Sequence, residues 1–206
     1  MRVVAVDGPV GSGKSTVARA VADRLDLPFL ESGAMYRVVA LVAVRRGIDP
    51  MAEGAADELA ALAAELDMEL GEKVLVDGVD VTSDLRSTEV GRTVSAVAAT
   101  AGVRTELVRR QREWVEEHGG AVVEGRDIGS VVFPDATVKV FLTASAAERA
   151  RRRELDETAD DLARRDLVDS TRAVSPLIVP QGAVVIDTTA RPIDEVVDEI
   201  VALLST

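Results

Sequence analysis

The chain has 206 residues, a formal net charge of −12 at pH 7, no cysteine and one histidine. This length suits one large hydrophobic core with insertions and leaves too little chain for two fully independent domains. The acidic balance disfavours non-specific binding to nucleic acid or to membrane surfaces, and the composition excludes disulfides, thiolate metal sites and histidine metal clusters.

Strand-like and helical patterns alternate along the first third of the chain. We expect strands over 2–6 and 28–30 and helices over 14–25, 33–46 and 53–66. Ser32 is expected to cap the second of these helices, which stops at Gly47. This alternation is typical of a mostly parallel sheet that is covered by helices.

The hydrophobic period changes after residue 66. Short alternating runs at 68–70, 73–76 and 79–81 are joined by Gly71-Glu72 and Asp77-Gly78, which are typical of tight hairpin turns. Parallel strands cannot be connected by turns this short. The sequence therefore predicts a small antiparallel excursion on the parallel sheet.

The remaining elements return to the first pattern. We expect helices over 87–100 and 103–117 and buried strands over 121–123, 138–142 and 184–186. Ser145 and Glu148 form a capping box, and Pro192 begins an amphipathic helix that ends near residue 204. The polar segment near 151–174 is expected to be mobile. The predicted fold class is α/β, with an open, mostly parallel sheet.

Residues 8–15 read Gly-Pro-Val-Gly-Ser-Gly-Lys-Ser, a complete phosphate-binding loop between the first predicted strand and helix. Its glycines let backbone N–H groups turn toward a polyphosphate, and the positive end of the following helix faces the same anion. Lys14 supplies charge for the β- and γ-phosphates, and the Ser15 hydroxyl is placed to ligate Mg²⁺. A structural glycine-rich turn is the alternative, which the correct flanking elements disfavour.

Four further polar clusters lie at predicted element ends, where an α/β sheet binds its ligands. They occupy residues 32–37, 124–129, 149–153 and 164–172, and arginine supplies 21 of the 24 basic residues of the chain. Each cluster has an ordinary alternative: a solvated face with surface ion pairs, a simple loop, a helix cap at Ser32 or a core position for Tyr36. Together with a phosphate loop, they favour a site for small anions.

In order along nearly the whole chain, these motifs resemble those of bacterial cytidylate kinases. The matching strings are Asp-Gly-Pro-x-Gly-Ser-Gly-Lys-Ser at 7–15, Ser-Gly-Ala-Met-Tyr-Arg at 32–37, Glu-Gly-Arg-Asp-Ile-Gly-x-Val-Val-Phe-Pro-Asp-Ala at 124–136 and Arg-Asp-x-x-Asp-Ser-x-Arg-x-x-x-Pro-Leu at 165–177. The resemblance implies transfer of the ATP γ-phosphoryl group to CMP or dCMP with Mg²⁺. It also implies a P-loop NTPase fold with a central parallel sheet, a monophosphate-binding insertion and a short lid.

The expected boundaries and partners follow from the same resemblance. The core would occupy about 1–66, 119–150 and 175–206, the insertion about 67–118 and the lid about 151–174. ATP and CMP or dCMP are the expected partners of a monomer that binds neither nucleic acid nor membrane. With no apolar stretch of membrane-spanning length and no basic leader, we expect a cytoplasmic protein.

The resemblance also implies roles for individual residues. ATP would be bound by Gly8, Pro9, Val10, Gly11, Ser12, Gly13, Lys14, Ser15, Thr16, Arg149 and Arg153, and Mg²⁺ by Ser15. The acceptor nucleotide would be bound by Ser32, Tyr36, Arg37, Ser95, Arg104, Gly125, Arg126, Asp127, Arg165, Asp169 and Arg172. Within this set, the cytosine-reading positions are Ser95, Arg104 and Asp127. The catalytic set would be Lys14, Arg126, Arg153 and Arg165.

Two departures and two alternatives accompany the resemblance. The lid from Arg153 to Arg165 is shorter than in better-known relatives, and Val168 stands where some of them carry another arginine. These departures affect the predicted lid contacts to ATP more than the predicted phosphate loop or acceptor site. Another small-molecule P-loop kinase, such as an adenylate or shikimate kinase, would not carry the cytosine-reading set. A GTPase-type switch would need an Asn-Lys-x-Asp motif, which the chain lacks.

Overall fold

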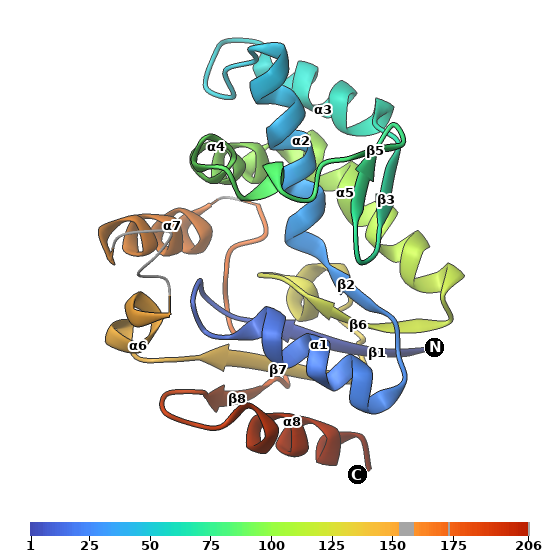
Figure 1. Cartoon of the computed structure of the whole chain (residues 1–206), viewed down its shortest axis with the longest axis vertical. Helices are drawn as coiled ribbons and strands as arrows, with labels where there is room; N and C mark the ends of the chain where they lie inside the picture. Colours follow the sequence, from blue (N-terminus) through green and yellow to red (C-terminus); the bar gives the residue numbers. More distant parts are fainter. Residues whose placement is uncertain (153–158, 173, 206) are drawn as a thin grey trace. The chain divides into compact units, whose positions relative to one another are not determined.

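The structure, a computed structural model, describes residues 1–152, 159–172 and 174–205. These residues form two compact units (Figure 1). The first unit consists of Met1–Glu31 and Trp114–Thr206, and the second of Ser32–Glu113. Among the described helices, none is long and apolar enough to span a membrane.

A five-stranded sheet forms the centre of the first unit (Figure 1). Its strands are β1 (Arg2–Asp7), β2 (Phe29–Glu31), β6 (Gly120–Glu124), β7 (Val138–Thr143) and β8 (Val184–Asp187). They pair in the order β2-β6-β1-β7-β8, and every pair is parallel. The carboxyl ends of all five strands therefore meet at one edge of the sheet, with β1 in the middle.

Helices α1 (Lys14–Leu25) and α8 (Ile193–Ala202) cover the sheet of the first unit. Val17 of α1 and Ile200 of α8 belong to one buried apolar cluster with Val4 and Val140 of the strands. The 3-10 helix η3 (Leu203–Ser205) follows α8. The π-helical turn η2 (Ile128–Val132) follows β6, and helix α6 (Ala146–Arg151) follows β7. Helix α7 (Ala159–Thr171) contacts α6.

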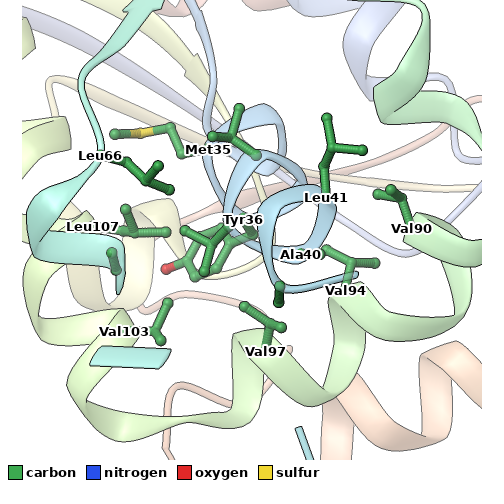
Figure 2. Close-up of a cluster of buried hydrophobic side chains, with 14 of the residues drawn as sticks. Met35, Tyr36, Ala40, Leu41, Leu66, Val90, Val94, Val97, Val103 and Leu107 are labelled. Atoms are coloured by element: carbon green, nitrogen blue, oxygen red, sulfur yellow. The ribbon is translucent and has the colours of Figure 1, made fainter. Parts of the chain in front are cut away.

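The second unit is mainly helical. It contains α2 (Ser32–Arg46), α3 (Ala55–Glu65), α4 (Thr88–Ala99), the 3-10 helix η1 (Asp84–Arg86) and all but the last four residues of α5 (Ala101–Glu117). Its core is a buried cluster in which Tyr36 and Leu41 of α2 lie among Val94 and Val97 of α4 and Leu107 of α5 (Figure 2). A small antiparallel sheet of β3 (Met68–Leu70), β4 (Val74–Val76) and β5 (Val79–Asp80) completes the unit.

The predicted parallel sheet and antiparallel hairpins are confirmed. The capping box is confirmed as well, because the Ser145 hydroxyl accepts a hydrogen bond from the Glu148 N–H at 3.2 Å. Two local expectations differ from the structure: Ser32 is the first residue of α2 rather than its cap, and residues 159–171 form a regular helix within the segment expected to be mobile. Because most residues of that segment are charged, its sequence has no clear hydrophobic pattern of a helix. The mobility of the segment stays a prediction.

Candidate active site

The loop at residues 8–13 begins directly after β1 and ends at α1 with glycine-dependent geometry. Gly8 has φ +148°, and a Cβ atom there would lie 2.1 Å from the Leu142 carbonyl oxygen. Gly13, at the helix N-cap, has φ +88°. No larger residue fits the first position, and few adopt the backbone of the second. The loop therefore has the open backbone that a polyphosphate needs, at the positive end of α1.

Lys14 is the first residue of α1 and is almost fully buried. Its ammonium donates to the Pro9 carbonyl oxygen at 2.9 Å, and the Ser12 hydroxyl donates to the same oxygen at 3.0 Å. The lysine side chain thus extends back to the backbone of its own loop. This places a point charge where the terminal phosphates of a nucleotide would lie.

Ser15 contacts a carboxylate that the sequence analysis did not assign. Its hydroxyl donates to Oε2 of Glu124, the last residue of β6, which is the strand beside β1. The available signal was a carboxylate that ends an apolar strand, 121–124. Mg²⁺ prefers oxygen ligands and keeps several waters, so one hydroxyl and one carboxylate beside bound phosphates fit its chemistry. Within the described residues, no cluster of three or more acidic or histidine side chains could hold a metal.

Residues 125–129 form a tight turn that is attached to β1. The Gly125 N–H donates to the Val6 carbonyl at 3.0 Å. The Asp7 carboxylate then accepts the N–H of Ile128 at one oxygen and that of Gly129 at the other, both at 2.8 Å. This turn carries Arg126 and Asp127, so two predicted acceptor residues are positioned from the centre of the sheet.

Burial raises the pKa of Asp7 to about 6, against the lowering effect of its two backbone hydrogen bonds. The neighbouring Asp127 raises this pKa further, and Lys14 lowers it. The side chain is completely inaccessible to solvent. Asp7 is therefore a buried acid that titrates close to neutrality and whose ionised form is held by backbone N–H groups.

Four predicted acceptor residues of the first unit form one alternating charge network. Arg126 Nε donates to Asp169 Oδ2 at 2.9 Å, and Arg172 lies 3.6 Å from the other Asp169 oxygen and 4.0 Å from Asp127 Oδ1. Burial lowers the pKa of Arg126, but Asp169 and Glu124 outweigh burial and raise it above its ordinary value. The structure therefore brings together residues that lie more than 40 positions apart in the chain.

Two arginines in or directly after helix α6 contact the phosphate loop. Arg149 donates to the Val10 carbonyl at 3.0 Å and forms an ion pair with Asp166 of α7, while Asp166 accepts the Val10 N–H at 3.3 Å. Arg152 donates to the Gly11 carbonyl at 3.4 Å. The sequence analysis missed Asp166 and Arg152; the uninterrupted arginine run at 151–153 was the only signal for the latter.

Thr188, the residue after β8, contacts the phosphate loop. Its hydroxyl donates to the Ser12 carbonyl at 2.9 Å and accepts from Arg152 Nη1 at 3.0 Å. Of the remaining predicted residues of the first unit, Pro9, Thr16 and Gly125 lie in or beside the loop and the turn, and Arg165 lies in α7. Arg153 lies outside the described residues.

The other predicted acceptor residues lie in the second unit. Arg104 is buried on α5, donates to the Ala98 carbonyl at 3.2 Å and lies 5.4 Å from the centre of the Tyr36 ring, a cation–π arrangement. Arg37 donates to the Leu85 carbonyl at 3.0 Å. Ser32 begins α2, and Ser95 is half-buried on α4. Tyr36 is a core residue as well as a site candidate, because its ring packs beside Leu107 (Figure 2).

The parallel sheet, the glycine loop and the following helix define a P-loop nucleotide-binding protein. The profile of the family described as cytidylate kinase matches residues 4–206. The chain is 48% identical to the cytidylate kinase of Desulforamulus reducens, over 97% of this chain and 95% of that protein. It is 46% identical to the cytidylate kinase of Rhodococcus jostii, over 98% and 94%. The chain belongs to the cytidylate kinase family.

Three further proteins are similar to this chain in sequence or in fold. A bifunctional pantoate ligase/cytidylate kinase of Synechococcus is 47% identical over 98% of this chain, which corresponds to 40% of that longer protein. Among solved structures, a sugar kinase from a Janibacter species aligns over 100% of this chain and 95% of its own, with a TM-score of 0.53 and 17% identity. Shikimate kinase from Acinetobacter baumannii aligns over 100% and 93%, with a TM-score of 0.50 and 14% identity. At these identities the structural likeness shows the fold alone.

The raised pKa of Asp7 predicts a pH-dependent stability. Because the folded state keeps the proton up to about pH 6, this contribution to stability is complete below 3.8 and is lost as the pH rises through about 6. We expect the free energy of unfolding of the wild type, minus that of Asp7→Asn, to fall by roughly 2 kcal/mol between about pH 4 and pH 7. Urea denaturation followed by circular dichroism measures this difference, and a pH-independent difference would contradict the assignment.

Proposed function

We propose that this protein transfers the γ-phosphoryl group of ATP to CMP and dCMP, giving ADP and the nucleoside diphosphates. One observation carries the proposal: the phosphate loop follows β1, and the turn with Arg126 and Asp127 follows the adjacent strand β6, so both leave the carboxyl edge of one sheet. Asp169 and Arg172 contact this turn from α7 and the residue after it. The family membership supports the choice of cytosine nucleotides. The solved sugar and shikimate kinases share only the fold, so they support no other acceptor.

The donor side is proposed to work by positioning and charge. The N–H groups of the loop and the positive end of α1 hold the phosphates, and Lys14 exchanges its bond to the Pro9 carbonyl for bonds to the β- and γ-phosphates. Arg149 and Arg152, which already contact the loop backbone, add positive charge at its rim. Phosphoryl transfer spreads negative charge over the transferred group, so fixed cations lower its barrier without any covalent step.

Mg²⁺ is proposed to bind at Ser15 and Glu124. When bound, the ion neutralises and orients the β- and γ-phosphates. Glu124 holds the Ser15 hydroxyl in place through a hydrogen bond from strand β6. The serine is therefore oriented by a side chain of the protein itself.

The acceptor side is proposed to combine phosphate and base recognition. Arg126 binds the acceptor phosphate, and its raised pKa keeps it charged throughout the physiological range. The Asp127 carboxylate accepts a hydrogen bond from the N4 amino group of cytosine, and uracil has no such group. The family resemblance assigns Ser32, Tyr36, Arg37, Ser95 and Arg104 to the same nucleotide, and Arg165, Asp169 and Arg172 to its sugar and phosphate.

The donor role of Lys14 has a direct test. Lys14→Ala is expected to lower kcat with ATP and CMP by roughly two to three orders of magnitude, because a cation at the transferred phosphate is lost. Lys139→Ala is the matched control, since Lys139 also donates to a proline carbonyl five residues earlier, Pro134, at 2.9 Å. We expect this control to keep its turnover, and near-normal turnover in Lys14→Ala would contradict the donor assignment.

The metal assignment predicts a changed Mg²⁺ requirement. Glu124→Gln is expected to raise the Mg²⁺ concentration for half-maximal activity by about tenfold or more, because an amide is a poorer ligand than a carboxylate. Asp198→Asn, which changes an exposed ion pair with Arg24, serves as the control. A Mg²⁺ titration that is unchanged in Glu124→Gln would remove this residue from the proposed metal site.

Base selectivity is tested by comparing CMP with UMP. The wild type is expected to prefer CMP and dCMP, and Asp127→Ala is expected to lose about ten- to a hundredfold in kcat/KM for CMP and to narrow the CMP to UMP ratio. Arg172 keeps Asp169 as a partner in this variant. Arg37→Ala is the comparison, because loss of a phosphate contact should depress both acceptors about equally. An unchanged ratio in Asp127→Ala would exclude Asp127 from base recognition.

A further inference from the structure

Asp7 occupies an unusual place for a charged side chain. It is the last residue of the central strand β1, its side chain is wholly buried, and the next residue, Gly8, begins the phosphate loop. Burial of an unpaired carboxylate is costly, so its retention needs specific partners. Those partners are two backbone N–H groups of a different segment, residues 128 and 129.

These two N–H groups are the first of the π-helical turn η2. A helix start is commonly capped by the side chain of the residue just before it, and aspartate is among the favoured caps. Here that residue is Asp127, whose side chain makes no capping hydrogen bond, and its φ is −144°. Asp7, 120 positions earlier in the chain, caps the turn in its place.

The Asp7 cap therefore connects the proposed ATP-binding loop with the proposed acceptor-binding turn. On one side, Asp7 continues directly into Gly8 and the phosphate loop. On the other side, the capped turn carries Arg126 and Asp127, and a second hydrogen bond from the Gly125 N–H to the Val6 carbonyl attaches it to the same strand. The carboxylate of Asp7 supplies a side-chain link in this attachment.

We propose that Asp7 is a positioning residue that holds the 125–129 turn, and with it the acceptor-binding Arg126 and Asp127, in register with the phosphate loop. The inference rests on the proposed CMP kinase activity. In-line transfer needs donor and acceptor phosphates held within a fraction of an ångström, and misplacement by about 1 Å costs up to roughly a hundredfold in rate. A carboxylate on the central strand meets this need better than a local cap, because it connects the turn directly to the strand that continues into the phosphate loop.

The test is the isosteric variant Asp7→Asn. The amide keeps the size of the side chain but has only one oxygen, so one of the two N–H groups at 128 and 129 faces an NH₂ group instead of an acceptor. We expect kcat for CMP to fall by about ten- to a hundredfold and KM for CMP to rise. ATP affinity, measured by calorimetry, is expected to be kept or strengthened, because the bonds of Lys14 and Ser15 are untouched and a negative charge near Lys14 is removed.

Hydrogen exchange supplies a readout besides activity. Amide exchange at 128 and 129 is expected to accelerate in Asp7→Asn, with the strands β1, β6 and β7 as protected as in the wild type. Asp49→Asn is the matched control, because the exposed Asp49 also accepts a backbone N–H, from Met51 at 2.9 Å. We expect this control to retain the wild-type kcat and exchange.

Any of the following outcomes would overturn the inference. A kcat within about twofold of the wild type would overturn the positioning role, given that a 1 Å misplacement costs far more. Weakened ATP binding in parallel with kcat, exchange that rises across the whole sheet, or failure of Asp7→Asn to fold would assign Asp7 a purely structural role and overturn the inference. Absence of CMP phosphorylation by the wild type would instead remove the proposed function, and the inference with it.

Discussion

The concentration of guanidinium groups at one edge of the parallel sheet is the constraint on which the rest of the first unit depends. Unbalanced, these charges would repel one another and lose hydration on folding. The chain supplies the counter-charges itself. Asp169 and Asp166 of α7 pair with Arg126 and Arg149, and the pairs Arg172–Asp169 and Arg152–Glu148 are local. The site is thus built from alternating charges that the chain itself supplies.

These internal counter-charges have the same sign as nucleotide phosphates. A bound phosphate therefore competes with the carboxylates for the same arginines, and a doubly charged phosphate is the stronger partner. Two of the carboxylates, Asp166 and Asp169, belong to α7, so the polar attachment of this helix to the phosphate loop and to the 125–129 turn consists of exchangeable contacts. Polar contacts of this kind allow a helix to change partners at little cost, unlike the apolar packing of α1 and α8 on the sheet.

The central strand plays the opposite role, because its contacts are not exchangeable. Val6 and Asp7 attach the 125–129 turn by hydrogen bonds that are buried in the sheet, and Gly8 packs against the Leu142 carbonyl with no room for a side chain. The first unit thus combines a frame built from backbone hydrogen bonds with a rim of charged side chains that are held by ion pairs. Catalysis by positioning requires the first, and entry and release of charged ligands require the second.

The sequence by itself determined the phosphate loop, the parallel and antiparallel segments and the capping box, because spacing and backbone preference act locally. The roles of most candidate site residues came from the resemblance to a family, and they stay predictions. The sequence could not show that Glu124 holds Ser15, that Asp166 reaches Val10 or that Asp7 caps residues 128 and 129. The chain has 36 acidic residues, and the local sequence around these three does not identify their partners. Only the tertiary structure decided these pairings, because parallel strands joined by long crossovers bring together strand ends that lie more than 100 residues apart.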